Sequence, residues 1–193
     1  MIKKSVKRLI SFIIAVLLVV LTTVPVCADP ETSVYKAIKG TTTTFKKYLV
    51  VDKYADIPGT DFSFTIKAAA DSDISQTEGQ LEVYAGPDAD KVKIGMNGKT
   101  IFVPGQSTTA GTETDGIVKD INKKYAVNEV TVDFSRISFD QPGIYRYIIT
   151  EAAQPEGSLF TNDEVPTRTL DVYIQDNKGK LQVQGYVMYK DSV

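Results

Sequence analysis

The sequence predicts an all-β fold, a sandwich or a barrel, for most of the chain. From Asp29 onward almost nothing has the period of a long helix. Instead, short runs of Val, Ile, Tyr, Phe and Thr alternate with clusters of Gly, Pro, Asn and Asp. The clearest run is PGIYRYIITE at 142–151, whose alternation puts Tyr145, Tyr147, Ile149 and Glu151 on one face. We expect this run to be a central strand with that aromatic face inward.

Residues 1–28 have the three parts of a secretion signal and are expected to form its helix. A start with four Lys and Arg precedes an apolar run over 9–21 and the cleavage pattern Val26-Cys27-Ala28. The apolar run is shorter than the roughly 20 residues of a spanning helix, which argues against a signal anchor. A lipoprotein that keeps Cys27 is disfavoured, because no small residue precedes that cysteine. We therefore expect one exported domain over 29–193, secreted or on the cell surface.

The composition of residues 29–193 limits the classes of function. Four of the 22 Lys and Arg leave with the signal, which holds no acids, so that 18 remain against 24 Asp and Glu, a formal net charge of −6. Such a domain lacks the basic surface that binds nucleic acid. It also lacks cysteine, which excludes disulfides, and histidine, the commonest general base and metal ligand. We expect no metal and no cofactor.

The first strand is expected over 42–51, and it carries a lysine in an apolar row. One face of this strand consists of Phe45, Lys47, Leu49 and Val51. Lys46 falls on the other face, although a β-bulge would exchange the two lysines. The ordinary interpretation is that Lys47 reaches past the sheet edge into water.

Further strands are expected in order along the chain: 62–68, 81–84, 92–94, 100–103, 130–139, 169–175 and 181–190. The polar stretch at 71–80 predicts a helical turn or an excursion loop. The Thr-rich and Gly-rich segment at 105–116 predicts a mobile loop. The run Asp176-Asn177-Lys178-Gly179 predicts a tight hairpin turn between the last two strands.

Glu151 ends the inward row of the central strand. A carboxyl group at the end of an apolar row must be paired, neutralised or near the rim. A frayed strand end, with the carboxylate in water, is the simpler alternative. Lys47 and Glu151 are thus two charged residues at positions where an aliphatic side chain is the usual choice.

Three segments, in order, resemble one family: TTTTFKKYLVVDKYADIPGTDFSFTI, FDQPGIYRYIITE and TRTLDVYIQDNKGKLQVQGYVMYK. They are similar to the major-pilin, or T-antigen, domains of Gram-positive surface pili, which are related to the B repeats of collagen adhesins. The resemblance implies an immunoglobulin-like β-sandwich displayed on the cell wall. It also implies a spontaneous intramolecular isopeptide bond between a first-strand lysine and a last-strand asparagine, assisted by a buried glutamate.

On this resemblance, Lys47 is the expected cross-link nucleophile and Glu151 the expected catalytic proton shuttle. Burial of the lysine disfavours its charged form and makes the neutral amine accessible. Burial of the glutamate beside two tyrosines favours the protonated acid, which can polarise an amide and move protons as ammonia leaves. The reaction occurs once per molecule, so we do not expect an enzyme.

The acceptor asparagine is expected to be missing from this chain. In the family it lies on a strand after the one that here ends at Lys190, and no such strand follows. The other asparagines lie in loops, in a turn or outside terminal strands: Asn97, Asn122, Asn128, Asn162 and Asn177. We therefore expect no intramolecular isopeptide bond, and a sandwich that lacks its last strand and exposes an edge for strand addition. Either the chain is a fragment of a longer pilin or it accepts a strand from another chain.

The leading hypothesis is a structural subunit or domain of a surface pilus. Expected partners are other pilin subunits, a sortase, for which Lys190 is the candidate lysine, and host surface ligands; no nucleic acid and, after signal cleavage, no membrane are expected. The alternative is a secreted adhesin-type module that binds a ligand through 105–116. A hydrolase with a carboxylate pair is disfavoured, because Glu151 is the only acid in an apolar frame.

Overall fold

The structure is a computed structural model that describes residues 38–190 except for 75–76, 79–80 and 115. The predicted signal peptide and its helix lie outside the described residues. The strands are β1 (Ile38–Lys39), β2 (Thr42–Asp52), β3 (Thr60–Ala68), β4 (Thr77–Glu78), β5 (Leu81–Ala85), β6 (Lys93–Ile94), β7 (Lys99–Phe102), β8 (Thr109–Ala110), β9 (Lys123–Asp133), β10 (Ser138–Phe139), β11 (Gly143–Glu151), β12 (Thr167–Asp176) and β13 (Leu181–Lys190). Two short 3-10 helices, η1 (Asp71–Asp73) and η2 (Ala89–Lys91), interrupt them. None of the helices in the described ranges is long and apolar enough to cross a membrane.

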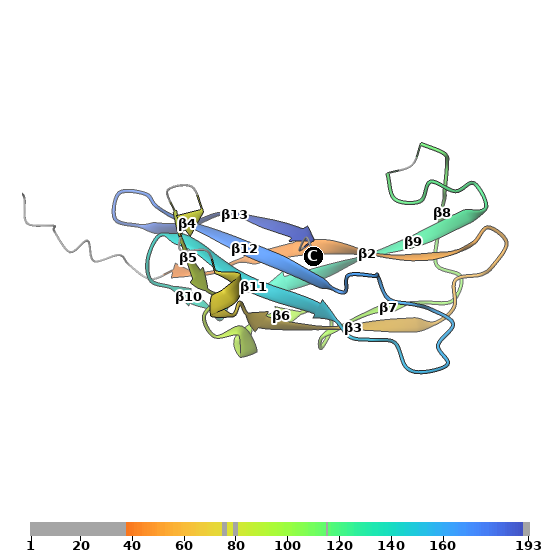
Figure 1. The fold of residues 1–193 in the computed structure, drawn as a ribbon, viewed down its shortest axis with the longest axis horizontal. Coiled ribbons are helices and arrows are strands. Elements are labelled where there is room, and N and C mark those ends of the chain that lie inside the picture. Colours follow the sequence, from red (N-terminus) through yellow and green to blue (C-terminus); the bar gives the residue numbers. More distant parts are fainter. Residues whose placement is uncertain (1–37, 75–76, 79–80, 115, 191–193) are drawn as a thin grey trace, which may run out of the picture. The chain divides into compact units, whose positions relative to one another are not determined.

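The larger sheet is built around β11 (Figure 1). Its strand order is β13-β12-β11-β3-β7. In addition, β5 pairs with β11, and β4 pairs with β5. One edge of β11 pairs antiparallel with β12, and the other pairs first with β5, in parallel, and then with β3, antiparallel. The prediction of a central strand at this point of the sequence is confirmed.

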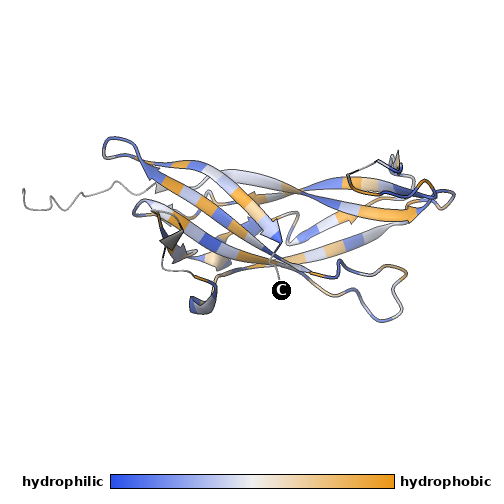
Figure 2. Cartoon of the chain, turned by 45° about the horizontal axis from the view of Figure 1, so that its top comes forward, coloured by the Kyte–Doolittle hydropathy of each residue, from blue (hydrophilic) through white to orange (hydrophobic). Residues whose placement is uncertain are grey.

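The smaller sheet has the strand order β2-β9-β6, and β8 also pairs with β9. The short strands β1 and β10 pair with each other in a separate two-stranded sheet. The strands β2 and β9 pair over their full lengths, from Thr42 opposite Asp133 to Asp52 opposite Lys123. Apolar side chains from both sheets form one hydrophobic cluster, and polar and apolar residues alternate along the long strands (Figure 2). This alternation is the pattern from which a β-sandwich was predicted, and the all-β fold class is confirmed.

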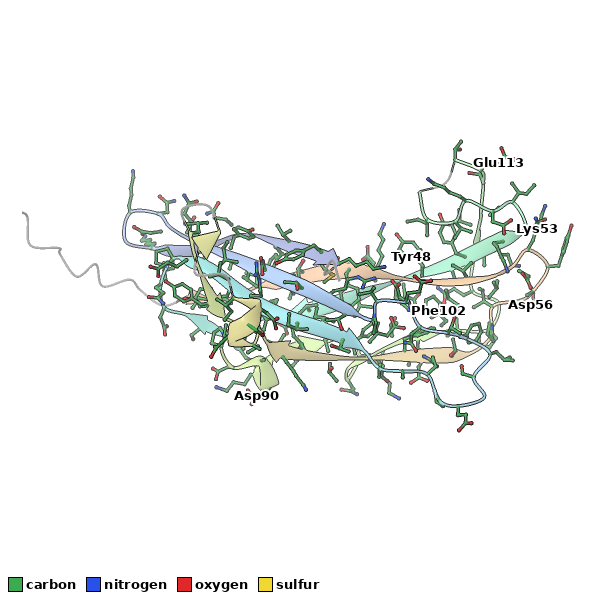
Figure 3. The ribbon with its side chains drawn as sticks, viewed as in Figure 1. Tyr48, Lys53, Asp56, Asp90, Phe102 and Glu113 are labelled. Carbon is green, nitrogen blue, oxygen red and sulfur yellow. The ribbon has the colours of Figure 1, made fainter. Side chains whose placement is uncertain are left out.

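Aromatic side chains lie inside the sandwich and charged side chains lie on its surface, as the alternating pattern predicts. Phe102 of β7 is fully buried, whereas Lys53, Asp56 and Glu113 are exposed in turns and loops and Asp90 is exposed on η2 (Figure 3). The charged loops therefore surround the cluster and leave its interior to apolar groups, apart from a few buried polar side chains.

Two expectations about the middle of the chain are wrong. The strand expected over 130–139 begins at Lys123 and ends at Asp133, because pairing with β2 extends it through a half-exposed stretch whose charged residues hide the alternation. The segment at 105–116 is not only a loop, since Thr109 and Ala110 form β8 on the edge of β9. In both places main-chain pairing between distant segments decides the conformation.

The hairpin turn between β12 and β13 is confirmed. Asn177 and Lys180 exchange main-chain hydrogen bonds, and the two residues between them have positive φ, 56° at Lys178 and 78° at Gly179. This is the geometry of a two-residue type I′ turn, which matches the twist of the strands it joins.

Two long strands keep an unpaired edge in the part of the chain that the structure describes. The strand β13 pairs with β12 alone, and β2 pairs with β9 alone. An unpaired strand edge presents main-chain donors and acceptors to which a further strand can add.

Candidate functional site

Lys47 and Glu151 meet between the two sheets. Lys47 lies on the inward face of β2 and Glu151 is the last residue of β11. The Nζ atom of Lys47 lies 2.8 Å from Oε1 and 2.7 Å from Oε2 of Glu151. The two side chains are only 13% and 8% exposed, whereas Lys46 is exposed on the opposite face of β2. The regular strand, without a bulge at this point, therefore selects Lys47 over its neighbour.

Aromatic rings lie beside this ion pair. The Nζ atom lies 4.3 Å from the centroid of the Phe62 ring, which is itself 1% exposed. Phe45 and Phe64 pack edge to face beside it, with ring centroids 5.3 Å apart. Removal of two charges from water is costly, and the mutual attraction and the ring face offset part of this cost. The pair is thus held in surroundings that disfavour free charges.

Asn162 completes the polar contacts of Glu151. It lies in the loop 152–166, which joins β11 to β12, and its Nδ2 donates to Oε1 of Glu151 at 2.6 Å and to the Ala152 carbonyl at 2.8 Å. Its Oδ1 accepts from the main-chain N–H of Gln154 at 2.7 Å. The sequence places Asn162 in a loop, as observed, but no periodicity shows that this loop folds back onto the end of β11.

A groove of about 580 Å³ opens beside these residues. It is lined by residues 45–50 of β2, the phenylalanines of β3, the end of β11, the second half of the loop 152–166, and Met188 of β13. The groove therefore lies between the two strands that keep an unpaired edge. None of the described residues of 105–116, the loop on which the ligand-binding alternative depends, lines it.

A second buried ion pair lies on the other face of β11. Arg146 donates from Nε and Nη2 to the two carboxylate oxygens of Asp171, each at 2.8 Å, and Tyr189 donates to Oδ2 at 3.3 Å. Asp171 is fully buried and Arg146 is 8% exposed. The face opposite the tyrosines is thus covered as well, which the sequence analysis missed. The sequence signal for this ion pair is a single charged residue within an apolar stretch of each strand, Arg146 in β11 and Asp171 in β12.

The structure does not bring the remaining candidate residues to this site. Lys190 ends β13 and makes an exposed ion pair with Asp163 at 3.6 Å. Asn128 donates to the Ile101 carbonyl, and Asn177 lies in the hairpin turn. Within the described ranges there is no group of three or more His, Cys, Asp or Glu side chains that could hold a metal ion.

Comparison with known proteins identifies one family. Residues 33–192 match the family FctA, described as a Spy0128-like isopeptide containing domain. Similar solved structures include three major pilins of Streptococcus pyogenes. The pilin T3.2 is 23% identical with a TM-score of 0.47, and the match covers 81% of this chain and 49% of that pilin; a second major pilin is 25% identical with a TM-score of 0.43, and the match covers 80% of this chain and 47% of that pilin. The pilin T-13 is 23% identical with a TM-score of 0.41, and the match covers 80% of this chain and 48% of that pilin. The chain thus spans about half the length of each pilin. Among curated proteins none matches it.

Proposed function

Because this chain belongs to the family of Spy0128-like isopeptide containing domains, we propose that it is a structural subunit or domain of a Gram-positive surface pilus, with Lys47 and Glu151 as its cross-link centre. The observation that supports this proposal is the largely buried ion pair between the two residues, with the Phe62 ring against the lysine nitrogen. On this proposal the protein is exported to the cell surface, and its partners are other pilin subunits and a sortase.

The pair can supply the chemistry of amide formation without a cofactor. Transfer of one proton from Nζ of Lys47 to Glu151, along either hydrogen bond, converts the ion pair into a neutral amine and a neutral acid. Apolar surroundings favour this neutral pair, because neither member then carries a charge out of water. The amine is the nucleophile, and the acid can return the proton to the departing nitrogen of an amide.

In the family that the sequence resembles, the acceptor amide comes from a strand that follows the equivalent of β13. We propose that this strand, from an extension of the chain or from another subunit, enters the groove beside β2. Strand addition would satisfy the unpaired edge of β2 with main-chain hydrogen bonds and bring an inward asparagine to Glu151. The covalent bond would then make the addition irreversible.

Intact-mass measurement tests this proposal. Residues 29–193 are fused to a strand of alternating apolar residues with one inward asparagine, and bond formation lowers the mass by about 17 Da, the ammonia released by the attack of the amine. Lys47→Ala and Glu151→Ala are expected to abolish the mass loss, and the exposed neighbour Lys46→Ala is expected to keep it. A fused strand with alanine in place of its asparagine separates this acceptor from any other in the chain. A folded fusion that keeps its full mass would contradict the proposal.

A further inference from the structure

We propose that Asn162 is a placeholder for the acceptor amide. Its side chain occupies a hydrogen-bonding position on Glu151 until a strand enters the groove, and it is then displaced and not consumed. This inference rests on the proposed function and deepens it, because it concerns how an added strand reaches the pair of Lys47 and Glu151. Asn162 is thus a positioning residue that regulates access to this pair.

The first support is the contact between the amide and the carboxyl group. Nδ2 of Asn162 donates to Oε1 of Glu151 at 2.6 Å, the same oxygen that accepts from Nζ of Lys47 at 2.8 Å. An amide that reacts with the lysine must lie against this carboxyl group, because the carboxyl group exchanges protons with the amine and with the departing nitrogen. Asn162 therefore already presents to Glu151 the chemical group that an added strand would bring.

The second support is the place of Asn162 in the groove of about 580 Å³. Residues 45–50 of β2 line this groove on one side and residues 159–163 of the loop line it as well, so a strand added along β2 meets this part of the loop. The structure describes every residue of the loop 152–166, and none of them lies in a strand. The amide can therefore withdraw while the pairing of β11 with β12 stays intact.

The third support is the way in which the loop holds the amide. Oδ1 of Asn162 accepts from the main-chain N–H of Gln154 at 2.7 Å, and Nδ2 also donates to the Ala152 carbonyl at 2.8 Å. The same side chain thus closes its own loop and contacts Glu151. When a strand enters, its amide replaces the contact with Glu151, whereas water replaces the two contacts inside the loop.

Strand entry is then an exchange of one amide for another, because two amides cannot hold the same position on Oε1 of Glu151. The incoming asparagine gains its contact with Glu151 only where Asn162 gives up its own, so the net gain is small in the native chain. Removal of the Asn162 side chain leaves the position open, and the same contact then contributes fully. The contributions of the two asparagines are therefore coupled, as they would not be for a contact that only supports the loop.

A synthetic peptide tests the exchange by its rate of bond formation. The peptide has alternating apolar residues and one inward asparagine, and its product with residues 29–193 has the summed mass less about 17 Da. Asn162→Ala is expected to form this product about tenfold faster than the native chain, the factor that one hydrogen bond to a charged group corresponds to. Asp163→Ala is the matched control, because it removes the ion pair of the loop with Arg168 and keeps Asn162. This control is expected to react at the native rate.

The affinity of the unreacted peptide separates a placeholder from a contact that only supports the loop. Lys47→Arg keeps a cation beside Glu151 but has no reactive amine, so calorimetric titration measures binding without bond formation. In this background, replacement of the peptide's asparagine by alanine is expected to change Kd little. When Asn162→Ala is added, the same replacement is expected to weaken binding about tenfold. Support of the loop alone would change Kd of both peptides by the same factor.

Several results would overturn the inference. They are equal rates for Asn162→Ala and the native chain, no product from Asn162→Ala although the fusion with an acceptor strand loses ammonia, and equal effects of the peptide's asparagine with and without Asn162. A loss of ammonia from the native chain without peptide would also overturn it, since a placeholder is not consumed. The proposed function stands wherever the fusion loses ammonia. If neither the fusion nor the peptide reacts with any variant, both fail.

Discussion

Burial of Lys47 or Glu151 alone would be costly, because each side chain is charged. The attraction between the two opposite charges offsets part of that cost. The side chains of Lys47 and Glu151 are 13% and 8% exposed, and Nζ of Lys47 donates to both carboxylate oxygens of Glu151. The burial cost of two such charges can exceed their attraction, so a pair of this kind is weak support for stability by itself. A chemical role explains such a pair better than a stabilising one, which is the basis of the proposed function.

A stability comparison tests this view of the pair. In residues 29–193 without an added strand, Glu151→Ala is expected to cost about 3 to 5 kcal/mol of unfolding free energy, because it leaves the lysine buried without its partner. The double change Lys47→Met, Glu151→Leu is expected to cost far less. Urea unfolding measures both. Equal losses for the two variants would show that the pair itself stabilises the fold.

Asp171 and Arg146 make the corresponding prediction on the other face of β11. Asp171→Ala is expected to cost about 3 to 5 kcal/mol, since it leaves a guanidinium buried without its carboxylate. Asp61, whose ion pair with Lys99 is about half exposed, is the control, and Asp61→Ala is expected to leave the unfolding midpoint almost unchanged. Chemical denaturation compares the two variants. A similar midpoint for both would contradict the assigned burial.

At the level of single elements, β11 is held on both faces and along both edges. Tyr147 lies at its middle, fully buried, and its O–H donates to the Pro87 carbonyl at 2.9 Å. The main chain of Gly86 lies directly against this ring, where an added Cβ would come within 2.3 Å of ring atoms. The strand therefore depends on close packing as well as on main-chain pairing.

Gly86→Ala tests this close approach. Because the tyrosine ring is enclosed and cannot withdraw freely, the substitution is expected to cost about 1 to 3 kcal/mol of unfolding free energy, the usual range for overpacking. Gly116→Ala, at a position with no atom near the added Cβ, is the matched control. Thermal and urea unfolding provide the measurement. A neutral effect at Gly86 would show that the ring can move.

Three buried or partly buried tyrosines, Tyr84, Tyr145 and Tyr147, predict a loss of stability in alkali. Burial raises the pKa of Tyr84 to about 12, and burial also raises the pKa of Tyr145 and Tyr147 above the ordinary value of about 10. The folded protein thus keeps protons that the unfolded chain releases. This contribution to stability is complete below about pH 10 and is lost as the pH rises towards 12.

Absorbance of tyrosinate and urea midpoints, followed together as the pH rises above 9, measure this dependence. Tyr145→Phe is expected to weaken it, because that variant has one fewer buried group to titrate. A midpoint that does not change between pH 9 and pH 11 would contradict the expected linkage.

For the whole molecule, the proposed bond between Lys47 and an added strand would tie that strand covalently to β2. The domain has no cysteine after the predicted signal, so an isopeptide bond would take the place that disulfides hold in other exported domains. The added strand and β2 would then be unable to separate when the rest of the sandwich opens. This property suits a protein that bears tension.

The stability of the cross-linked domain tests this consequence. By analogy with a disulfide that closes a loop on the order of 100 residues, the bond is expected to contribute about 4 to 5 kcal/mol by restricting the unfolded chain. In the fusion with an acceptor strand, replacement of the strand's asparagine by alanine is expected to lose this contribution, and Lys46→Ala is expected to retain it. Denaturant unfolding, with the mass of each sample checked beforehand, gives the comparison. Equal stability of bonded and unbonded samples would contradict the mechanical role.

Local pattern alone identified much of this protein. Period-two alternation put Lys47 on the inward face of the first strand and Glu151 at the end of the central one, and turn chemistry located the hairpin at Lys178 and Gly179. These features depend on residues adjacent in the chain, whose side-chain directions follow from strand geometry.

Only the tertiary structure decided what these residues meet. It placed Asn162 on Glu151, paired Arg146 with Asp171, and began β9 at Lys123. Each depends on contact between segments far apart in the sequence, and a loop such as 152–166 has no period from which its return path could be read. Strand alternation assigns a side chain to a face, but the packing of the sheets and loops determines its partner.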